Sequence, residues 1–357
     1  MYLRRNLPTF VWALLCFSLM FVMCACRQQG GNALQAQNQP TTYNFGLPDD
    51  SMIIPPYLKR GDTIALVAPA YKDDWNEIKY AIQWLEKQGF HILKGQCIDL
   101  HHSTIYSGTD EERATDFQAM IDNPSVKAII ATRGGYGVVR MIDKVDWSHF
   151  REHPKWICGF SDITVIHSHV NRQCRVATIH SMMPLSIKAE NSEQIGAQSL
   201  LKALKGQPLS YAVPSSAKNR PGKATGELIG GNLSLLISLT GSVSEMDYEG
   251  KILFIEDCDE YYYHVDRMLM ELKRAGKLEH LAGLIVGGFV RLKEIETPNI
   301  KFGKTVEEIV WDVCGDYSYP ILFDFPAGHI KTNCALRLGT TCTMEVTGKG
   351  GYSTVKM

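Results

Sequence analysis

The feature of the sequence that most constrains the fold is an alternation of short apolar runs with helical segments over residues 61–170. The run GDTIALVAPA (61–70) is typical of a buried strand that ends in a proline-containing loop, and DWNEIKYAIQWLEKQGF (74–90) has apolar residues at helical spacing. A short strand, HILKG, and a second helix over 111–126 follow. Strands that alternate with helices in this way predict a parallel α/β sheet with helices on both faces.

Two further segments repeat the order of strand, turn and helix, and each has a distinctive turn. KAIIATRGGYGVVRMI (127–142) has a glycine-rich turn, and KWICGFSDITVIHSHV (155–170) has Gly-Phe-Ser-Asp at the same place. In parallel α/β sheets, ligands bind at loops beyond the carboxyl ends of the strands. The turns at 134–137 and 159–162 are therefore the first places to look for a functional site.

The rest of the chain indicates a second domain. A chain of 357 residues is long enough for two, because single hydrophobic cores stop growing at about 250–300 residues. Residues 206–225 are rich in proline, serine, lysine and glycine, which indicates an interdomain crossover. We therefore expect an N-terminal α/β domain over 56–205. Over 226–357 we expect a smaller β-rich domain with one or two helices, because its short apolar runs are more strand-like.

The N-terminal segment has a different composition from the rest of the chain. Arg4 and Arg5 precede a long uncharged stretch that stops at Cys26, directly after a small residue. This pattern resembles a bacterial lipoprotein signal, so we expect residues 1–25 to be a signal peptide and Cys26 to become the acylated N-terminus. An uncleaved anchor helix is the alternative, and both interpretations export the protein and tether it to a membrane. Residues 26–55 lack a sustained apolar period, which is typical of a flexible tether.

Composition excludes some classes of partner and site. The net charge of −1 provides no broad basic field, so we expect no nucleic-acid binding. Of the ten cysteines, three lie within the first 26 residues, and the other seven form no Cys-x-x-Cys pair. We expect most of the seven to be buried and to behave as small apolar residues. One or two disulfides in an oxidising compartment are the alternative.

Pairs of neighbouring histidines do not indicate a metal site. His167 and His169 are two residues apart, and on a helix such residues point to different faces. His101 and His102 have the same weakness as a ligand pair. We therefore expect neither a metal ion nor a cofactor.

Ser161, in the second distinctive turn, has two interpretations. Serine and aspartate are favoured helix N-caps, so Ser161 and Asp162 could simply satisfy the first amides of the helix. A serine on a sharp turn from strand to helix is also how a nucleophile is displayed, with nearby N–H groups stabilising an oxyanion. The α/β-hydrolase elbow needs a small residue two positions later, and Ile163 disfavours that fold.

Three other positions could take part in chemistry, and each also has an ordinary structural interpretation. The turn that contains Gly134 and Gly135 lacks nucleotide-binding spacing, so it is either a tight turn or a place where N–H groups approach an anion. Glu256, at the end of the apolar strand ILFIED, either orients a histidine or faces water. His329, in the loop FPAGH, is either a general base or a solvated side chain.

These motifs together resemble one known family. The segments ATRGGYG, GFSDIT, GELIGGNLSLL, LFIEDCDE, VDRML and FPAGH are similar, in this order, to those of the LD-carboxypeptidase family of serine peptidases. That family includes murein tetrapeptide carboxypeptidases and microcin C immunity peptidases. The resemblance runs from about Gly61 to Val346.

The resemblance implies a catalytic role for several residues. Ser161 would be the nucleophile, His329 the general base, and Glu256 the carboxylate that orients the imidazole. The backbone N–H of Asp162 and one from the Gly134–Gly135 turn would form the oxyanion hole. From this combination we expect Asp162, rather than Ser161, to cap the helix. The family fold would place Ser161 in the α/β domain and the other two residues in the β-rich domain, with the active site between them.

The resemblance also implies a substrate class. The family hydrolyses the bond between the L-centre of a diamino acid and a terminal D-alanine in muropeptides. Arg133 and Tyr136 are the candidate substrate-binding residues, Arg133 for the terminal carboxylate. Tyr71 stands where many relatives have a small hydroxyl residue, which puts that wall of the pocket in question. A homodimer is an expectation from the family.

Two alternatives to this function stay open at the level of sequence. The same triad could cleave a peptide–nucleotide conjugate or another peptide amide, although export fits poorly with a cytoplasmic nucleotide–peptide substrate. A non-enzymatic muropeptide-binding lipoprotein is the other alternative. Such a protein would have no need for Ser161, Glu256 and His329 together.

Overall fold

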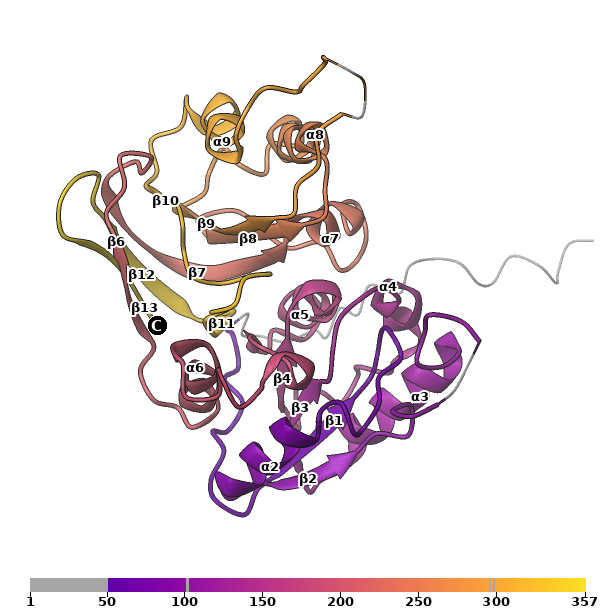
Figure 1. Cartoon of the computed structure of the whole chain (residues 1–357). Coiled ribbons are helices and arrows are strands. Elements are labelled where there is room, and N and C mark those ends of the chain that lie inside the picture. The colour runs from indigo at the N-terminus through magenta and orange to yellow at the C-terminus, as the bar shows by residue number, and fades with distance from the viewer. Residues whose placement is uncertain (1–50, 101–102, 296, 298) are drawn as a thin grey trace, which may run out of the picture. The chain divides into compact units, whose positions relative to one another are not determined.

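Two β-sheets organise the part of the chain that the computed structural model describes, which is residues 51–100, 103–295, 297 and 299–357 (Figure 1). The predicted signal peptide, Cys26 and most of the predicted tether lie outside these residues, as do His101 and His102. Within the described residues no helix is both long enough and apolar enough to cross a membrane.

The first sheet is the predicted parallel α/β sheet. Its strands lie in the order β11-β5-β4-β3-β1-β2, and all neighbours are parallel except β11 and β5. The strands are β1 (Thr63–Val67), β2 (His91–Lys94), β3 (Val126–Ala131), β4 (Trp156–Gly159), β5 (Thr178–His180) and β11 (Leu336–Leu338). Because β11 comes from the C-terminal part of the chain, that part completes this sheet.

Helices cover both faces of the first sheet, as its alternating pattern predicts. Along β1, Ile64 and Leu66 pack into a core with α2 and α6, whereas Ala65 and Val67 pack into a second core with α3 and α5. The α-helices of this region are α2 (Lys79–Lys87), α3 (Asp110–Asp122), α4 (Val138–Met141), α5 (Thr164–His169) and α6 (Ile195–Leu204). Short 3-10 turns span Ile142–Lys144, Ser161–Ile163 and Pro184–Ser186, and a π turn spans Val170–Cys174.

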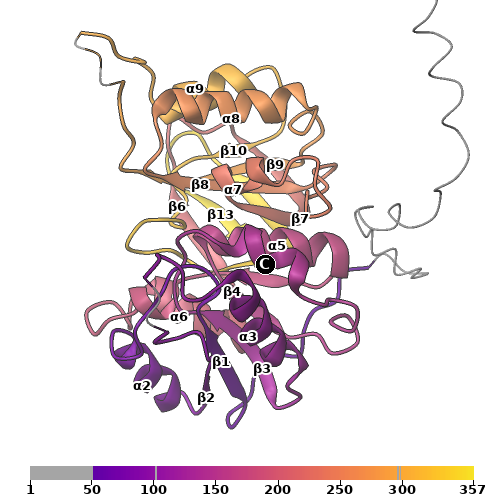
Figure 2. The same cartoon turned by 90° about the vertical axis from the view of Figure 1, so that its right-hand side faces the viewer.

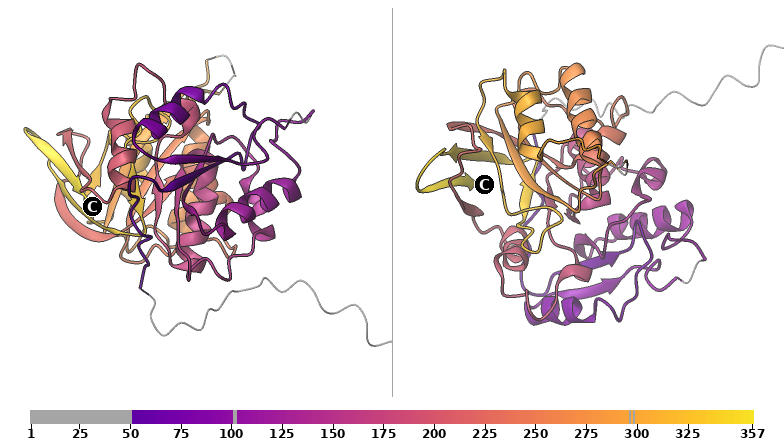
Figure 3. Two further views of the ribbon diagram at one scale, coloured as in Figure 1. Left: turned by 90° about the horizontal axis from the view of Figure 1, so that it is seen from below. Right: turned by 45° about the horizontal axis from the view of Figure 1, so that its top comes forward.

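The second sheet is half parallel and half antiparallel. Its order is β10-β9-β8-β7-β12-β13-β6, in which the first four strands are parallel neighbours and the remaining pairs are antiparallel. Figure 3 shows β6, β12 and β13 together at one end of this sheet. The strands are β6 (Ser210–Pro214), β7 (Gly222–Asn232), β8 (Ile252–Cys258), β9 (Gly283–Val290), β10 (Ile321–Leu322), β12 (Thr341–Val346) and β13 (Tyr352–Lys356).

Three helices accompany the second sheet among the described residues, where the sequence predicts one or two. They are α7 (Leu233–Ser238), α8 (Tyr262–Arg274) and α9 (Val306–Cys314). Leu253 and Ile255 of β8 share a core with apolar residues of α8 and α9. Figure 2 shows α5, which follows Ser161 in the chain, on the opposite face of this sheet from α8 and α9. The helix that follows the predicted nucleophile therefore lies against the second sheet.

The domain boundaries drawn from the sequence stay a prediction. The predicted crossover over 206–225 contains β6 and the start of β7, so part of it is ordered sheet. All seven cysteines after Cys26 are free, and six of them are buried. The prediction of buried cysteines is therefore confirmed, and the structure contains no disulfide among its described residues.

Candidate active site

The backbone at Ser161 makes the sharp turn that the sequence predicts. Strand β4 ends at Gly159, Phe160 is extended, and Ser161 adopts φ = 65°, in the left-handed region that disfavours a side chain. A Cβ at Gly159 would lie 2.8 Å from Ile163 Cγ1, so only glycine fits where the turn folds back. A residue held in the left-handed region costs about 1–3 kcal/mol, and such strain concentrates at functional sites.

Ser161, His329 and Glu256 form one chain of hydrogen bonds. Ser161 Oγ lies 3.1 Å from His329 Nε2, and His329 Nδ1 lies 2.6 Å from Glu256 Oε2. The backbone N–H of His329 also donates to Glu256 Oε2, at 3.1 Å. Glu256 is fully buried, whereas the His329 side chain is 15% exposed. The His329 imidazole is therefore open to a substrate, and its carboxylate partner is shielded from water.

A β-bulge in β9 positions the loop that carries His329. The register between β8 and β9 shifts opposite Glu256, where Gly287 and Gly288 stand against a single residue of β8. The Gly288 N–H donates to Ala327 O at 2.9 Å, which ties the loop to the strand. A Cβ at Gly328, whose φ is 106°, would lie 2.7 Å from Glu256 Oε2. Glycine at 328 is thus what lets the loop approach the carboxylate.

The hydrogen-bond pattern assigns the protons of this chain. Because Nδ1–H of His329 donates to Glu256, Nε2 is left to accept the Ser161 hydroxyl proton. Burial acts to lower the pKa of His329, but the hydrogen bond and negative charge of Glu256 outweigh it, so the pKa is raised. A more basic imidazole that still accepts from a serine hydroxyl can act as a general base.

The glycine-rich turn lies directly against Ser161. A Cβ at Gly134 would stand 2.9 Å from Ser161 Cβ and 3.5 Å from the backbone N of Asp162. A Cβ at Gly135, whose φ is 126°, would overlap the ring of Tyr71 at 2.2 Å. The structure therefore brings the three predicted oxyanion residues, Gly134, Gly135 and Asp162, together at Ser161. It also shows that Tyr71 packs on this turn.

Asp162 does not cap its own helix, so that prediction is wrong. The 3-10 turn begins at Ser161 after Phe160, which puts Asp162 inside the first turn, where its side chain cannot reach back to the first amides. Its Oδ2 instead accepts the N–H of Val138 at 2.9 Å, at the start of α4. Burial raises the pKa of Asp162 to about 6. Asp162 thus fastens the glycine-rich turn to the nucleophile turn.

The two candidate substrate-binding residues lie on the outer side of the glycine-rich turn. The guanidinium of Arg133 stands over the Tyr71 ring, 5.7 Å from its centroid, and donates to Lys72 O at 3.4 Å. Tyr136 is 43% exposed, with its ring 6.1 Å from that of Tyr106. Next to His329 the protein has a cavity, and neither Arg133 nor Tyr136 lines it. Their roles in binding stay predictions.

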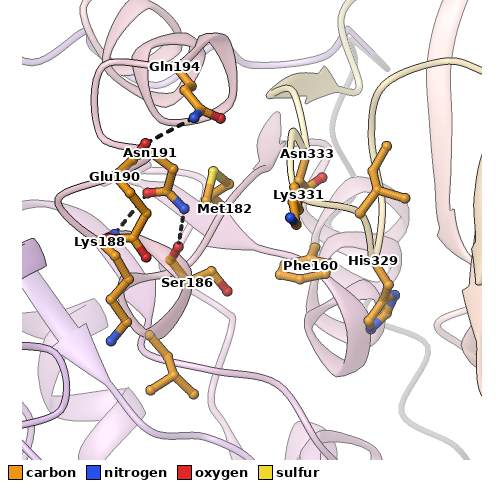
Figure 4. A pocket seen from close by; sticks show the side chains of 12 residues that line it. Phe160, Met182, Ser186, Lys188, Glu190, Asn191, Gln194, His329, Lys331 and Asn333 are labelled. Atoms are coloured by element: carbon orange, nitrogen blue, oxygen red, sulfur yellow. Dashed lines mark hydrogen bonds between the residues drawn. The ribbon is translucent and has the colours of Figure 1, made fainter.

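A cavity of about 580 Å³ opens beside His329 (Figure 4). One wall is the segment after β5, and the other is the loop from His329 to Asn333. No sequence pattern indicated the charged residues of these walls, although one wall follows the carboxyl end of a parallel strand, where ligands are expected. The lining residues are Phe160, Met182, Leu185, Ser186, Lys188, Glu190, Asn191, Gln194, His329, Ile330, Lys331 and Asn333.

Buried polar residues behind the triad were also missed. Asn333 Oδ1 accepts from the N–H of Gly328 at 2.8 Å and from His180 Nε2 at 3.0 Å, which holds the loop next to His329. His167 Nε2–H donates to Gly159 O at 2.9 Å, and burial lowers the pKa of His167 to about 3. His167 is therefore a neutral brace of the nucleophile turn, and its spacing from His169 carried no such signal.

One hydrogen bond joins the nucleophile helix to the second sheet. The backbone N–H of Asn232, at the end of β7, donates to Thr164 Oγ1 at 3.0 Å. A Cβ at Gly231 would lie 2.6 Å from the same oxygen, so a side chain there would push the two apart. The glycine of the GGN segment thus lets the end of β7 approach Thr164 closely enough for this hydrogen bond.

Comparisons with known proteins agree with this architecture. The sequence profile of the LD-carboxypeptidase N-terminal domain matches residues 64–181, and that of the LD-carboxypeptidase C-terminal domain matches residues 225–344. A Bacillus subtilis protein named probable murein peptide carboxypeptidase is 33% identical over 298 residues, which make up 83% of this chain and 92% of that protein.

Solved structures share the same arrangement of elements. The muramoyltetrapeptide carboxypeptidase of Oxalobacter formigenes is 26% identical and superposes with a TM-score of 0.74, covering 82% of this chain and 98% of that one. The microcin C7 self-immunity protein superposes with a TM-score of 0.76 at 22% identity, covering 85% of this chain and 98% of that one, which shows the fold alone. The resemblance predicted from the motifs is confirmed: this chain belongs to the LD-carboxypeptidase family and is a serine-type carboxypeptidase.

Proposed function

We propose that this protein is an exported, lipid-anchored LD-carboxypeptidase that removes the terminal D-alanine from murein tetrapeptides. The bond cleaved joins the L-centre of the diamino acid to D-alanine. The observation that carries the proposal is the hydrogen-bonded chain from Ser161 through His329 to the buried Glu256. The names of the Bacillus subtilis relative and of the Oxalobacter formigenes structure, a murein peptide and a muramoyltetrapeptide carboxypeptidase, support this substrate.

The proposed reaction runs through an acyl-enzyme. Ser161 Oγ attacks the carbonyl carbon of the diamino acid while His329 Nε2 takes its proton, and Glu256 stabilises the imidazolium that forms. The N–H of Asp162 and one from the Gly134–Gly135 turn stabilise the oxyanion. The imidazolium then gives its proton to the amine of D-alanine, which leaves. Water activated by His329 hydrolyses the ester and restores Ser161.

An exopeptidase must also recognise the free carboxylate at the end of its substrate. Arg133 precedes the oxyanion turn, and its guanidinium is held over the ring of Tyr71. A guanidinium so placed can pair with a carboxylate through two hydrogen bonds. We assign the terminal D-alanine carboxylate to Arg133, with Tyr136 at the entrance.

The test uses the full chain purified in detergent and a disaccharide-tetrapeptide. Mass spectrometry should detect loss of one D-alanine, with EDTA present throughout. Release of no D-alanine by a folded preparation would refute the proposal. A peptidyl sulfamoyl nucleotide serves as the second substrate, and faster cleavage of it than of the tetrapeptide would favour the microcin-like alternative.

Export and lipidation need a separate experiment, because they rest on the sequence of the first 26 residues. Cells that express the chain are labelled with a palmitate analogue and fractionated. The wild type should carry the label and sediment with membranes, and Cys26→Ala should lose the label. A label that persists in the Cys26→Ala variant would overturn the lipid anchor at this residue.

A further inference from the structure

A buried arginine ties together three loops at the edge of the first sheet that carries Ser161. Arg113 lies near the start of α3, and its side chain is fully buried. Its guanidinium donates to Pro69 O at 2.5 Å, to Gly108 O at 3.3 Å and to Gly137 O at 2.8 Å. These carbonyls belong to the loops that follow β1, β2 and β3, which are neighbours in the sheet. One side chain therefore holds three loops at their common edge.

The charge and the donors of Arg113 are all used inside the protein. Its Nη2 donates to Asp110 Oδ1 at 2.5 Å, and the same carboxylate pairs with the exposed Arg140 at 2.8 Å. The guanidinium also stands 5.2 Å from the centroid of the Tyr106 ring. A buried charge is tolerated when it is paired and hydrogen-bonded, and each nitrogen of this guanidinium has an acceptor. Arg113 therefore acts through the loops that it holds rather than on a ligand.

The peptide between Gly137 and Val138 is held from both sides by opposite charges. Its carbonyl oxygen accepts from Arg113 Nη1 at 2.8 Å, and its N–H donates to Asp162 Oδ2 at 2.9 Å. Burial raises the pKa of Asp162 to about 6, and the charge of Arg113 acts in the opposite direction. A Cβ at Gly137, whose φ is 139°, would lie 2.8 Å from Arg113 Nη1. A buried cation and a buried carboxylate thus clamp one peptide at the end of the glycine-rich turn.

This clamp lies next to the proposed oxyanion donors. One donor is the backbone N–H of Asp162, whose side chain is half of the clamp. The other donor comes from Gly134 and Gly135, earlier in the same short turn. The loop held at Pro69 O also carries Tyr71, whose ring packs against Gly135. The buried guanidinium therefore supports the turn directly at its end and indirectly through the tyrosine.

We propose that Arg113 is a positioning residue for the oxyanion hole, acting with the Asp162 carboxylate to fix the glycine-rich turn, an inference that rests on the reaction proposed above. An oxyanion hole is effective because its donors are in place before the negative charge develops. A lysine is a poor substitute, because one ammonium on a flexible stem lacks the planar fork that reaches several loops. Since the oxyanion exists only in the transition state, loss of the clamp should lower kcat and leave KM nearly unchanged.

The experiment measures disaccharide-tetrapeptide cleavage by the full chain and its variants. Arg113→Lys keeps the charge, and Arg113→Met removes it. Each should lower kcat by about 10²-fold with KM within about twofold, because a small displacement of a catalytic group is costly. In Arg113→Lys the acidic limb of the pH profile should stay in place, because His329 and its carboxylate partner are untouched. General damage to the fold would move the limb and KM as well.

Lys155 provides a matched control at the other end of α3. Its ammonium is buried and also donates to three backbone carbonyls, those of Met120, Ile121 and Asn123. Because Lys155 directly precedes β4, these contacts lie at the opposite edge of the parallel sheet from Ser161. Lys155→Met should lower stability to chemical denaturation and leave kcat unchanged. A loss of kcat equal to that of Arg113→Met would overturn the proposal, because any damage to α3 would then suffice.

A double-variant cycle tests whether Arg113 and Asp162 act on the same peptide. Asp162→Asn removes the charge but keeps an oxygen for the N–H of Val138. Arg113→Lys combined with Asp162→Asn should lower kcat by less than the product of the two separate effects, whereas adding Lys155→Met to Asp162→Asn should change kcat no further.

Three outcomes contradict the proposals, and they are distinguishable. A wild-type kcat in Arg113→Lys would overturn the positioning role and leave the proposed function intact. Independent effects of Arg113→Lys and Asp162→Asn would also overturn it, because the two side chains would then act separately. Release of no D-alanine by the folded wild type would overturn the proposed function and this inference with it.

Discussion

The two halves of the candidate active site are held in different ways. The Ser161 turn, residues 159–164, depends on backbone conformation at neighbouring positions, with Ser161 at φ = 65° and Gly159 packed on Ile163. The His329 loop, residues 325–333, depends on contacts with a strand 73 residues earlier in the chain. The Ser161 turn is a local structure that a short stretch of sequence can specify. The His329 loop, in contrast, takes its place only after the second sheet has formed.

The largest effect should come from removing the nucleophile, and two variants separate chemistry from strain. Ser161→Ala and Ser161→Gly should each lower kcat/KM by at least about 10⁴-fold. Glycine accepts the left-handed conformation, so Ser161→Gly should be about 1 kcal/mol more stable to unfolding than Ser161→Ala. Tetrapeptide assays and chemical denaturation measure both. Equal stability of the two variants would show that the turn stores no strain.

Removing the charge of Glu256, the carboxylate that the His329 loop contacts, should have the next largest effect. Glu256→Gln should lower kcat/KM by about 10³-fold, because the imidazolium loses its charged partner. Since Glu256 raises the pKa of His329, and the base must be neutral, the acidic limb of the wild-type profile should lie above about 6.5. The variant should move that limb to lower pH. A limb that stays in place would show that Glu256 does not set the pKa of the base.

The contact between the His329 loop and Glu256 is tested at Gly328. Gly328→Ala should lower kcat/KM by about 10²-fold, because the new Cβ would lie 2.7 Å from Glu256 Oε2 and displace the loop. Gly276→Ala is the matched control, since Gly276 also has a positive φ but a Cβ there meets nothing within 4 Å. A variant at 328 that is as active as the one at 276 would show that the close approach is not needed.

Removing the hydrogen bond that ties the Ser161 turn to the end of β7 should have a smaller effect. Thr164→Val keeps the shape of the side chain but leaves the buried N–H of Asn232 without its acceptor. We expect a loss of about 1–3 kcal/mol in the free energy of unfolding and about a tenfold lower kcat, with KM nearly unchanged. Denaturation and steady-state kinetics measure these values. Unchanged stability would mean that Asn232 finds another partner.

The same contrast explains which features the sequence predicts. The alternation of strand and helix predicts the first sheet and both distinctive turns, because those features are set by residues close together in the chain. The hydrogen bond of Asp162 to Val138 escaped prediction, since it joins two loops that meet only in the folded sheet. The motif order suggested Glu256 and His329 through family resemblance, while the physics of each segment alone favoured a solvated side chain.

The cavity beside His329 marks the limit of such reasoning. Glu190 and Lys331 lie in irregular segments with no periodicity, and they come together only where the segment after β5 faces the loop that carries His329. Nothing in the spacing of two such residues along the chain indicates that they share a cavity. The second sheet likewise has one more helix than the sequence predicts, because the six-residue helix α7 is too short to show a clear period.

The smallest expected effect concerns two helix caps, one beside each sheet. Thr109 and Thr305 each form a capping box, with Glu112 and Glu308 respectively. Thr109→Ala and Thr305→Ala should each cost about 1 kcal/mol of unfolding free energy, because both remove the same local bond, and neither should change kcat/KM. The two capping boxes should thus contribute equally to the stability of the two regions. Only the long-range contacts around Glu256 should make the two regions differ in their effect on activity. A loss of activity in Thr305→Ala without one in Thr109→Ala would show that α9 also positions the second half of the site.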